Sequence, residues 1–192
     1  MTMRNFLTSR FETALDFAFQ LHKNQYRKGS NIPYISHLLA VTAIVIENGG
    51  SENQAIAALL HDAVEDQGGY DTLQKIKEMF GSEVAEIVEG CTDAFTDPKP
   101  EWEGRKKAYL KKLKQSSDSI LLVSLADKVH NARSLLQDLQ SEEKNVWKKF
   151  NGGKEGTLWY YQSLVEILNT SPYPYLASEL SQVVKKIVKL SE

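Results

Sequence analysis

Apolar residues recur at steps of three and four along most of the chain, which is the period of an amphipathic α-helix. Phe11, Leu15, Ala18 and Leu21 form the first such stripe. The same spacing predicts helices over residues 36–48, 52–62, 71–79, 83–94, 101–114, 120–139, 156–168 and 176–190. No segment alternates apolar and polar residues as a half-buried strand does. The pattern therefore predicts an all-α fold, a bundle of roughly eight to eleven helices.

Residues that typically cap helix N-termini stand before two of these predicted helices. Ser51, with Gln54 three residues later, has the sequence of a capping box. Ser82 is expected to cap the helix that follows it. Residues 55–60 are apolar on nearly all sides. The helix over 52–62 is therefore expected to lie buried at the centre of the fold.

Composition narrows the class of protein. Of the 192 residues, 42% are hydrophobic and 25% are charged, which is typical of one globular domain over residues 1–192. No apolar run approaches the roughly 20 residues of a membrane helix, and residues 1–10 lack the apolar core of a signal peptide. Cys91 is the only cysteine. We therefore expect a cytoplasmic protein that has no membrane partner.

Charge is unevenly distributed. The net charge is −2, so a nucleic-acid partner is not expected. Basic residues nevertheless gather in one segment, at Arg105, Lys106, Lys107, Lys111, Lys112 and Lys114. A run of this kind is ordinarily a solvated helix face. It matters for function only if it converges on a site that handles phosphate.

The candidate chemistry begins with His61-Asp62 at the end of the buried helix. Burying an imidazole beside a carboxylate is costly unless both groups have partners. Glu65 and Asp66 follow at four-residue steps, so each falls on the same helical face as His61 or Asp62 if the helix continues. A nitrogen and oxygen donor set suits Mn²⁺, Fe or Mg²⁺ better than a structural zinc ion. On its own, the dipeptide is also compatible with a plain hydrogen-bonded pair.

Two distant residues favour the metal interpretation. His37 stands at the start of the second predicted helix, and Asp127 follows the apolar run over 121–126. A carboxylate in an apolar helix usually faces a cation. We therefore expect His37, His61, Asp62 and Asp127 to form one centre from three helices.

The ordered pattern resembles the HD superfamily of metal phosphohydrolases, and in particular the (p)ppGpp hydrolase domain of RelA/SpoT-type enzymes and stand-alone small alarmone hydrolases. The matching segments are Tyr26-Arg27-Lys28-Gly29, Pro33-Tyr34-Ile35-Ser36-His37, His61-Asp62-Ala63-Val64-Glu65-Asp66 and Leu125-Ala126-Asp127-Lys128-Val129-His130-Asn131. The similarity covers residues 14–168, and residues 171–192 contribute a C-terminal helix. The family usually has proline where this chain has Leu38, and its link corresponding to residues 95–105 is usually shorter.

The resemblance implies a fold, a reaction and roles for single residues. It implies a Mn²⁺ centre, with other divalent cations as alternatives, whose ligands are His37, His61, Asp62 and Asp127. It implies that Glu65 and Asp66 orient or deprotonate the attacking water. It implies substrate contacts from Arg27, Lys28, Asn131 and Tyr160. The reaction would remove the 3′-pyrophosphate of ppGpp or pppGpp, giving GDP or GTP and pyrophosphate.

Two other functions fit the same residues. The first is an HD phosphohydrolase that acts on another nucleotide or a phosphorylated metabolite, since one metal centre serves many substrates. The second is a non-catalytic nucleotide-binding module. The presence of all four expected ligands together with Glu65 and Asp66 argues against the second.

Overall fold

The computed structural model describes residues 7–96, 98–142 and 146–192. The chain divides into two compact units, Met1–Lys99 and Pro100–Glu192, each with its own packing. The described residues form helices and no strand, apart from one isolated antiparallel bridge between Tyr26 and Pro33. The all-α fold expected from the apolar pattern is confirmed. The single domain over residues 1–192 stays a prediction.

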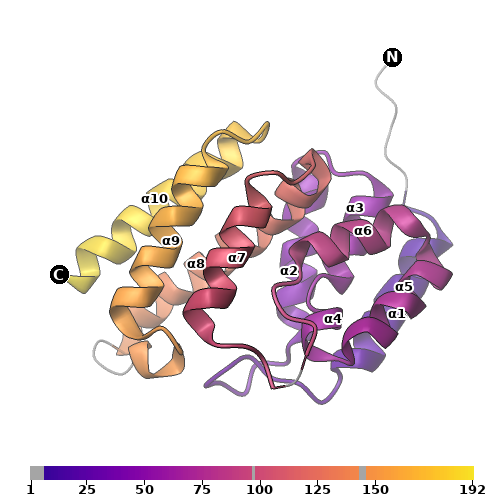
Figure 1. The fold of residues 1–192 in the computed structure, drawn as a ribbon, viewed down its shortest axis with the longest axis horizontal. Helices are drawn as coiled ribbons and strands as arrows, with labels where there is room; N and C mark the ends of the chain where they lie inside the picture. The colour runs from indigo at the N-terminus through magenta and orange to yellow at the C-terminus, as the bar shows by residue number, and fades with distance from the viewer. Residues whose placement is uncertain (1–6, 97, 143–145) are drawn as a thin grey trace. The chain divides into compact units, whose positions relative to one another are not determined.

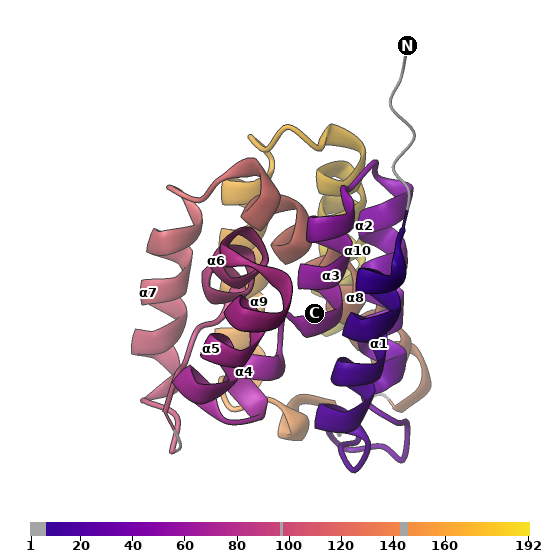
Figure 2. The same ribbon diagram turned by 90° about the vertical axis from the view of Figure 1, so that its right-hand side faces the viewer.

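The first unit is a set of helices gathered around one buried helix, α3 (Figure 1). Its helices are α1 (Ser9–His22), α2 (Ile35–Glu47), α3 (Glu52–Leu60), α4 (Ala63–Asp66), α5 (Gly69–Phe80) and α6 (Ser82–Cys91). Residues 55–60 of α3 are fully buried, as their continuous apolar character predicts. Helices α1, α2 and α6 pack against α3, and Figure 2 shows α1 alongside it.

The second unit is built on the long helix α8. Its helices are α7 (Trp102–Leu113), α8 (Asp118–Glu142), the short 3₁₀ helix η1 (Val146–Lys149), α9 (Gly153–Leu168) and α10 (Pro174–Ser191). Helix α10 packs along α8 and α9, and α7 packs on α9. The apolar stripe of α10, including Leu176, Leu180 and Ile187, is buried there.

The position of the Trp102 side chain explains why two residues of the second unit are glycines. A Cβ atom at Gly152 would lie 2.5 Å from the indole ring of Trp102, and one at Gly156 would lie 3.0 Å from it. The ring therefore occupies the space that side chains at these two positions would need. Trp102 belongs to the segment that departs from the family pattern, and it packs inside its own unit.

Helix starts and ends follow the local sequence with two differences. The capping box is confirmed, since Gln54 N–H donates to Ser51 Oγ at 3.3 Å and Ser51 N–H donates to Gln54 Oε1 at 2.7 Å. Ser82 is the first residue of α6 and not its cap, because Gly81, with φ of 93°, occupies the cap position. The expected helix over 52–62 ends at Leu60, and a short new helix begins at Ala63.

The sequence predicts neither a membrane-spanning helix nor a signal peptide. No helix in the described segments is long and apolar enough to cross a bilayer. The expected absence of a signal peptide falls partly on residues 1–6, which lie outside the described residues.

Candidate metal centre

His61 is prepared as a metal ligand by one hydrogen bond. The residue follows the last turn of α3 and is 3% exposed. Its Nδ1 lies 2.7 Å from the carbonyl oxygen of Ala58, which can only accept, so Nδ1 carries the proton. In the neutral ring the lone pair is then on Nε2. A hydrogen bond of this type, from one ring nitrogen to a carbonyl, fixes the tautomer of histidines that bind metals through the other nitrogen.

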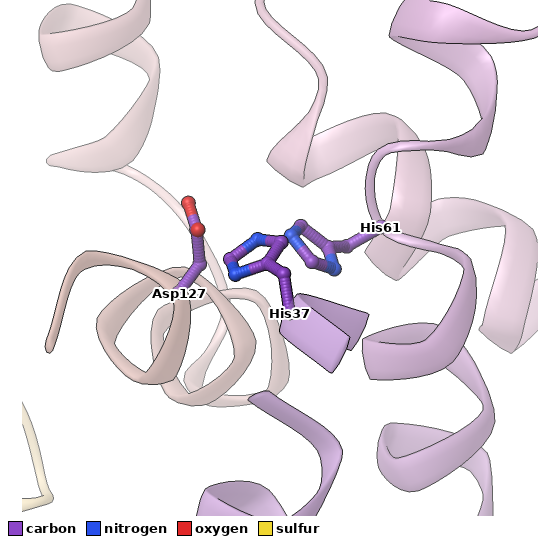
Figure 3. Close-up of side chains that lie close together, drawn as sticks. All are labelled: His37, His61 and Asp127. Atoms are coloured by element: carbon purple, nitrogen blue, oxygen red, sulfur yellow. The ribbon is translucent and has the colours of Figure 1, made fainter. Parts of the chain in front are cut away.

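His37 lies beside His61 in the same unit. It is in the first turn of α2 and fully buried. The two imidazole rings meet edge to face, with centroids 5.2 Å apart, and a nitrogen of each lies within 4.8 Å of the other (Figure 3). The start of α2 and the end of α3 therefore bring two imidazoles, from residues 24 apart in the chain, to one point.

Asp62 completes this cluster within the first unit. Its Oδ2 lies 3.4 Å from Nε2 of His37 and 3.1 Å from Nε2 of His61. The hydroxyl of Tyr34 donates to the same oxygen at 2.5 Å and holds the carboxylate in place. Two imidazole nitrogens and a carboxylate oxygen form a donor set that suits Mn²⁺ or Fe. The chemistry of the residues present therefore fits a divalent cation.

Asp62 lies in the short interruption between α3 and α4. Asp62 has φ of −97° and ψ of −4°, outside the usual helical values, and it precedes the first residue of α4. Its backbone carbonyl still accepts from Asp66 N–H at 3.0 Å. The Asp62 carboxylate lies close to both imidazoles, and α4 presents Glu65 and Asp66 one turn later.

Glu65 and Asp66 share one cation, the ammonium of Lys99. Nζ of Lys99 lies 2.8 Å from Glu65 Oε1 and 2.9 Å from Asp66 Oδ1. Burial alone would lower the pKa of Lys99, but its two carboxylate partners more than offset this and raise it above the usual range. Lys99 thus stays charged at all moderate pH values.

Glu65 has the pKa of a group that can exchange a proton near neutrality. Burial is the main cause that raises it from 4.5 to about 7, and repulsion from Asp93 and Asp62 adds to this effect. The ammonium of Lys99 acts in the opposite direction. A carboxylate with a pKa close to the working pH is suited to general acid–base catalysis.

A cavity of about 510 Å³ opens next to this acid pair within the first unit. Its lining comprises Val64, Glu65, Asp66, Gly68, Gly69, Tyr70, Asp71, Phe95, Thr96 and Lys99. The rings of Tyr70 and Phe95 stack there with centroids 4.6 Å apart. A space of this size next to polar groups is the kind of place where small ligands bind.

Asp127 is held by its own helix in the second unit. It lies on α8 and is 5% exposed. Lys128 Nζ lies 2.5 Å from its Oδ2, and Asn131 Nδ2 donates to its Oδ1 at 2.5 Å. Burial would lower the pKa of Lys128, but the charge of Asp127 outweighs it and the pKa is raised. The expectation that Asp127 joins the imidazoles stays a prediction.

The expected substrate contacts lie on both units. In the first, Arg27 places its guanidinium 5.8 Å from the centroid of the Tyr34 ring, and Lys28 is exposed in the loop before α2. In the second, Tyr160 is 7% exposed and has the ammonium of Lys106 4.9 Å from its ring centroid. Asn131 bonds to Asp127, as described above. The nucleotide contacts of these four residues stay predictions.

Several hydrogen bonds of this architecture are not predictable from the sequence. Gln25, Tyr34 and Lys128 each bond to a carboxylate of the expected site, at Asp66, Asp62 and Asp127 respectively. Tyr34 and Lys128 belong to the matching segments and Gln25 adjoins one of them, but nothing local shows which carboxylate each contacts. Hydrogen bonding between residues up to 41 apart does not follow from local patterns.

The described part of the chain is all-α, and its two buried histidines lie with Asp62 beside an acid pair, a donor set whose chemistry suits a divalent cation. The model of the HD domain matches residues 14–158. The chain belongs to the HD-domain family, and membership implies a divalent-metal site.

Curated relatives of the family are similar over much of the chain. Guanosine-3′,5′-bis(diphosphate) 3′-pyrophosphohydrolase MESH1 of Xenopus tropicalis is 42% identical over 125 residues, which cover 64% of this chain and 67% of that protein. A probable guanosine-3′,5′-bis(diphosphate) 3′-pyrophosphohydrolase of Synechocystis sp. is 36% identical over 136 residues, which cover 68% of this chain but 17% of that protein.

Solved structures share the fold. One, described as a metazoan ortholog of SpoT that hydrolyzes ppGpp and plays a role in starvation responses, has a TM-score of 0.78 and 26% identity, over 95% of this chain and 98% of that one. A second, from Listeria monocytogenes EGD-e, has a TM-score of 0.68 and 31% identity, over 80% of this chain and 99% of that one. The expected HD-type helical fold is confirmed.

Proposed function

We propose that this chain is a Mn²⁺-dependent phosphohydrolase of the cytoplasm that removes the 3′-pyrophosphate of ppGpp or pppGpp, giving GDP or GTP and pyrophosphate. The observation that carries the proposal is the cluster of His37, His61 and Asp62 next to the acid pair of Glu65 and Asp66. The names of the curated relatives and the described activity of the structural neighbour support this choice of substrate.

The metal ligands in this proposal are His37, His61, Asp62 and Asp127. Two neutral imidazoles and two carboxylates suit Mn²⁺, and the Nδ1 hydrogen bond of His61 leaves its Nε2 ready to bind. When bound, the ion supplies a lower pKa for water and neutralises charge on the phosphate oxygens.

The acid pair supplies the proton transfer. Glu65 accepts a proton from the attacking water, while Asp66 orients that water. The water oxygen forms a bond to the phosphorus next to the ribose 3′ oxygen, and the bond between these two atoms breaks. The ribose oxygen leaves and takes up a proton. With a pKa of about 7, Glu65 can both accept and return a proton near neutrality.

The positive side chains hold the nucleotide in this proposal. Arg27 and Lys28 lie on one loop and contact the guanine base, while Asn131 and Tyr160 contact the nucleotide from the second unit. Lys99, beside Glu65 and Asp66 in the cavity, is the basic residue in the best position to attract a phosphate group there.

The direct test measures the products. Purified protein is incubated with ppGpp and Mn²⁺, and GDP and pyrophosphate are quantified, with a parallel sample that contains a chelator. We expect equal amounts of GDP and pyrophosphate with Mn²⁺ and neither with the chelator. Absence of both products with Mn²⁺ present would contradict the proposal.

Variants separate metal binding from turnover. His61→Ala and Asp62→Ala should abolish both bound metal and activity, because each removes a ligand. Glu65→Ala should keep the metal, measured by elemental analysis, and lose at least about 100-fold in turnover, the usual size of a general-base effect. A Glu65→Ala variant that retained most of its rate would rule out the proton-transfer role. A wild-type protein without bound metal would favour the non-catalytic module.

One observation favours a second substrate class. The cavity beside the acid pair is lined in part by Phe95, Thr96 and Lys99, from the segment that departs from the family pattern. An HD phosphohydrolase with this altered wall could prefer another nucleotide. A panel containing ppGpp, 5′-nucleotides and NADPH distinguishes the two, and faster turnover of a compound other than ppGpp would favour the second class.

A further inference from the structure

Gln25 lies where three parts of the first unit meet. It follows the end of α1, and its side chain reaches across to α4. Its Nε2 donates to Asp66 Oδ2 at 2.9 Å, and its Oε1 accepts from Gln67 Nε2 at 2.7 Å. The same Oε1 lies 2.7 Å from Nδ1 of His22. The one amide group of Gln25 therefore contacts the proposed catalytic acid Asp66, the adjacent Gln67 and the buried His22.

These contacts determine which way the amide points. Gln67 donates to the oxygen, and Nδ1 of His22 also faces the oxygen and so carries the proton. The amide nitrogen is then directed at Asp66. Burial lowers the pKa of His22, whose side chain is 1% exposed, so the ring is neutral at neutral pH and the arrangement is stable there.

His22 extends the connection toward the metal ligands. Its ring stacks on Tyr34, with centroids 5.3 Å apart and an angle of 16° between the planes. The Tyr34 hydroxyl donates to Asp62. The carboxylates of Asp62 and Asp66 are thus both supported from the same side, by Tyr34 and Gln25, which pack on His22.

The backbone of Gln25 also closes the loop that carries Arg27 and Lys28. Its N–H donates to the His22 carbonyl at 2.9 Å, and its carbonyl accepts from Tyr34 N–H at 2.9 Å. These backbone bonds do not depend on the identity of the side chain. A substitution at position 25 can therefore remove the bond to Asp66 while the loop stays closed.

We propose that Gln25 is a positioning residue that orients the carboxylate of Asp66 for the attacking water. The inference rests on the proposed function, because the role of Asp66 belongs to it. A carboxylate that is free to rotate loses the geometry on which water orientation depends, and misplacement by about 1 Å can reduce a rate by about 100-fold. The metal ligands keep their own hydrogen bonds in this scheme.

The experiment compares Gln25→Met and Gln25→Glu with the wild type. Methionine keeps the length of the side chain and removes both amide atoms, while glutamate keeps an acceptor for His22 and Gln67 but loses the donor to Asp66. We expect kcat for ppGpp to fall about 10- to 100-fold in both variants, with KM and the Kd for Mn²⁺ within about twofold of wild type. A loss of folding alone would move Tm and Mn²⁺ binding as well.

Gln74→Met is the matched control. Gln74 also donates its amide to a carboxylate, Glu78 Oε1 at 2.9 Å, but on the exposed face of α5. Its kcat, KM and Tm should match those of wild type. An unchanged kcat in Gln25→Met, or equal losses in Gln25→Met and Gln74→Met, would overturn the positioning role.

A crystal structure of Gln25→Met separates this inference from the proposed function. We expect the Asp66 carboxylate to rotate away from its wild-type orientation while His61 and Asp62 stay in place. An Asp66 side chain that keeps its wild-type rotamer would overturn the inference, whatever the substrate. If the wild-type protein releases no pyrophosphate from ppGpp, the proposed function fails, and this structural comparison still decides the role of Gln25.

Discussion

A single hydrogen bond, from His61 Nδ1 to the Ala58 carbonyl, determines which nitrogen of a buried ring can bind a metal. A single hydrogen bond also acts at Asp62. There the hydroxyl of Tyr34 donates to the carboxylate oxygen that lies close to both imidazoles. Such supporting bonds commonly change metal affinity or activity by about 10- to 100-fold when they are removed. The behaviour of the site therefore depends on residues that touch neither metal nor substrate.

Glu65 should make the stability of the metal-free protein depend on pH. In the unfolded chain its carboxyl loses a proton near pH 4.5, while in the folded protein it keeps the proton until about pH 7. Above pH 4.5 the unfolded state therefore binds fewer protons, so the free energy of unfolding falls as the pH rises to about 7. Glu65→Gln, which stays neutral, should lack this fall of about 3 kcal/mol. Urea unfolding with a chelator present, at several pH values in this range, measures it.

The exposed residue Glu103 provides the control for this comparison. Glu103→Gln should show the same change of stability with pH as the wild type. If Glu65→Gln also followed the wild-type curve, the environment of Glu65 would not disfavour its charged form.

Lys128 should contribute much more to stability than an ordinary surface lysine. Its ammonium is buried between Asp127 and the ring of Tyr109, whose centroid is 5.2 Å away. Lys128→Met leaves the Asp127 carboxylate buried without its main cation, which costs about 3–5 kcal/mol. Lys149→Met removes the cation that pairs with Asp138 of α8. The Asp138 side chain is 37% exposed, so this change should cost less than about 1 kcal/mol. Chemical unfolding of both variants measures the difference, and equal losses would contradict this view of Lys128.

At the scale of single residues, the sequence indicates the histidines and carboxylates of the site better than the side chains that hydrogen-bond to them. His61 and Asp62 stand out because an imidazole and a carboxylate are costly to bury without partners. Glu65 and Asp66 stand out by helical spacing, and their catalytic role is what the family resemblance implies. Gln25 was not identified, because a glutamine near a helix end has no local feature that reveals a partner on another helix.

At the scale of elements, helix ends determine where the functional side chains lie. The helix expected over 52–62 is interrupted between Leu60 and Ala63, and Asp62 lies in this interruption. The periodicity of apolar residues predicted the helices but not this break, since no glycine or proline marks it. The contacts that Asp62 makes there, with Tyr34 and His37, come from residues distant in the chain.

The packing of Trp102 makes a prediction for the second unit. Gly152→Ala would place a Cβ atom 2.5 Å from the indole ring, which must then shift. Overpacking of this kind costs about 1–3 kcal/mol. Gly104→Ala, in the first turns of α7, meets only the flexible Glu101 carboxylate at 3.4 Å and should be neutral or stabilise by up to about 1 kcal/mol. Thermal unfolding of the two variants checks the opposite signs.

At the scale of the whole molecule, metal binding should be linked to folding. A cation that binds only the folded protein stabilises it by about 2.7 kcal/mol at a concentration 100 times its Kd. We expect this gain with Mn²⁺ in the wild type and most of it to disappear in Asp127→Ala, because Asp127 is proposed as a ligand. Urea unfolding with and without Mn²⁺ measures the gain. If Asp127→Ala retained the full gain, Asp127 would not be a ligand.

The sequence by itself determined the helical class, the approximate extent of the helices and the residue types of the metal centre. These properties depend on local periodicity and on motifs of a few adjacent residues, so they can be recognised without a fold. Only the tertiary structure decided that Asp62 lies between two imidazoles, that Gln25 holds Asp66 and that Trp102 covers Gly152. Each of these depends on at least one contact between residues distant in the chain, and its geometry is determined by how helices pack and not by the local sequence.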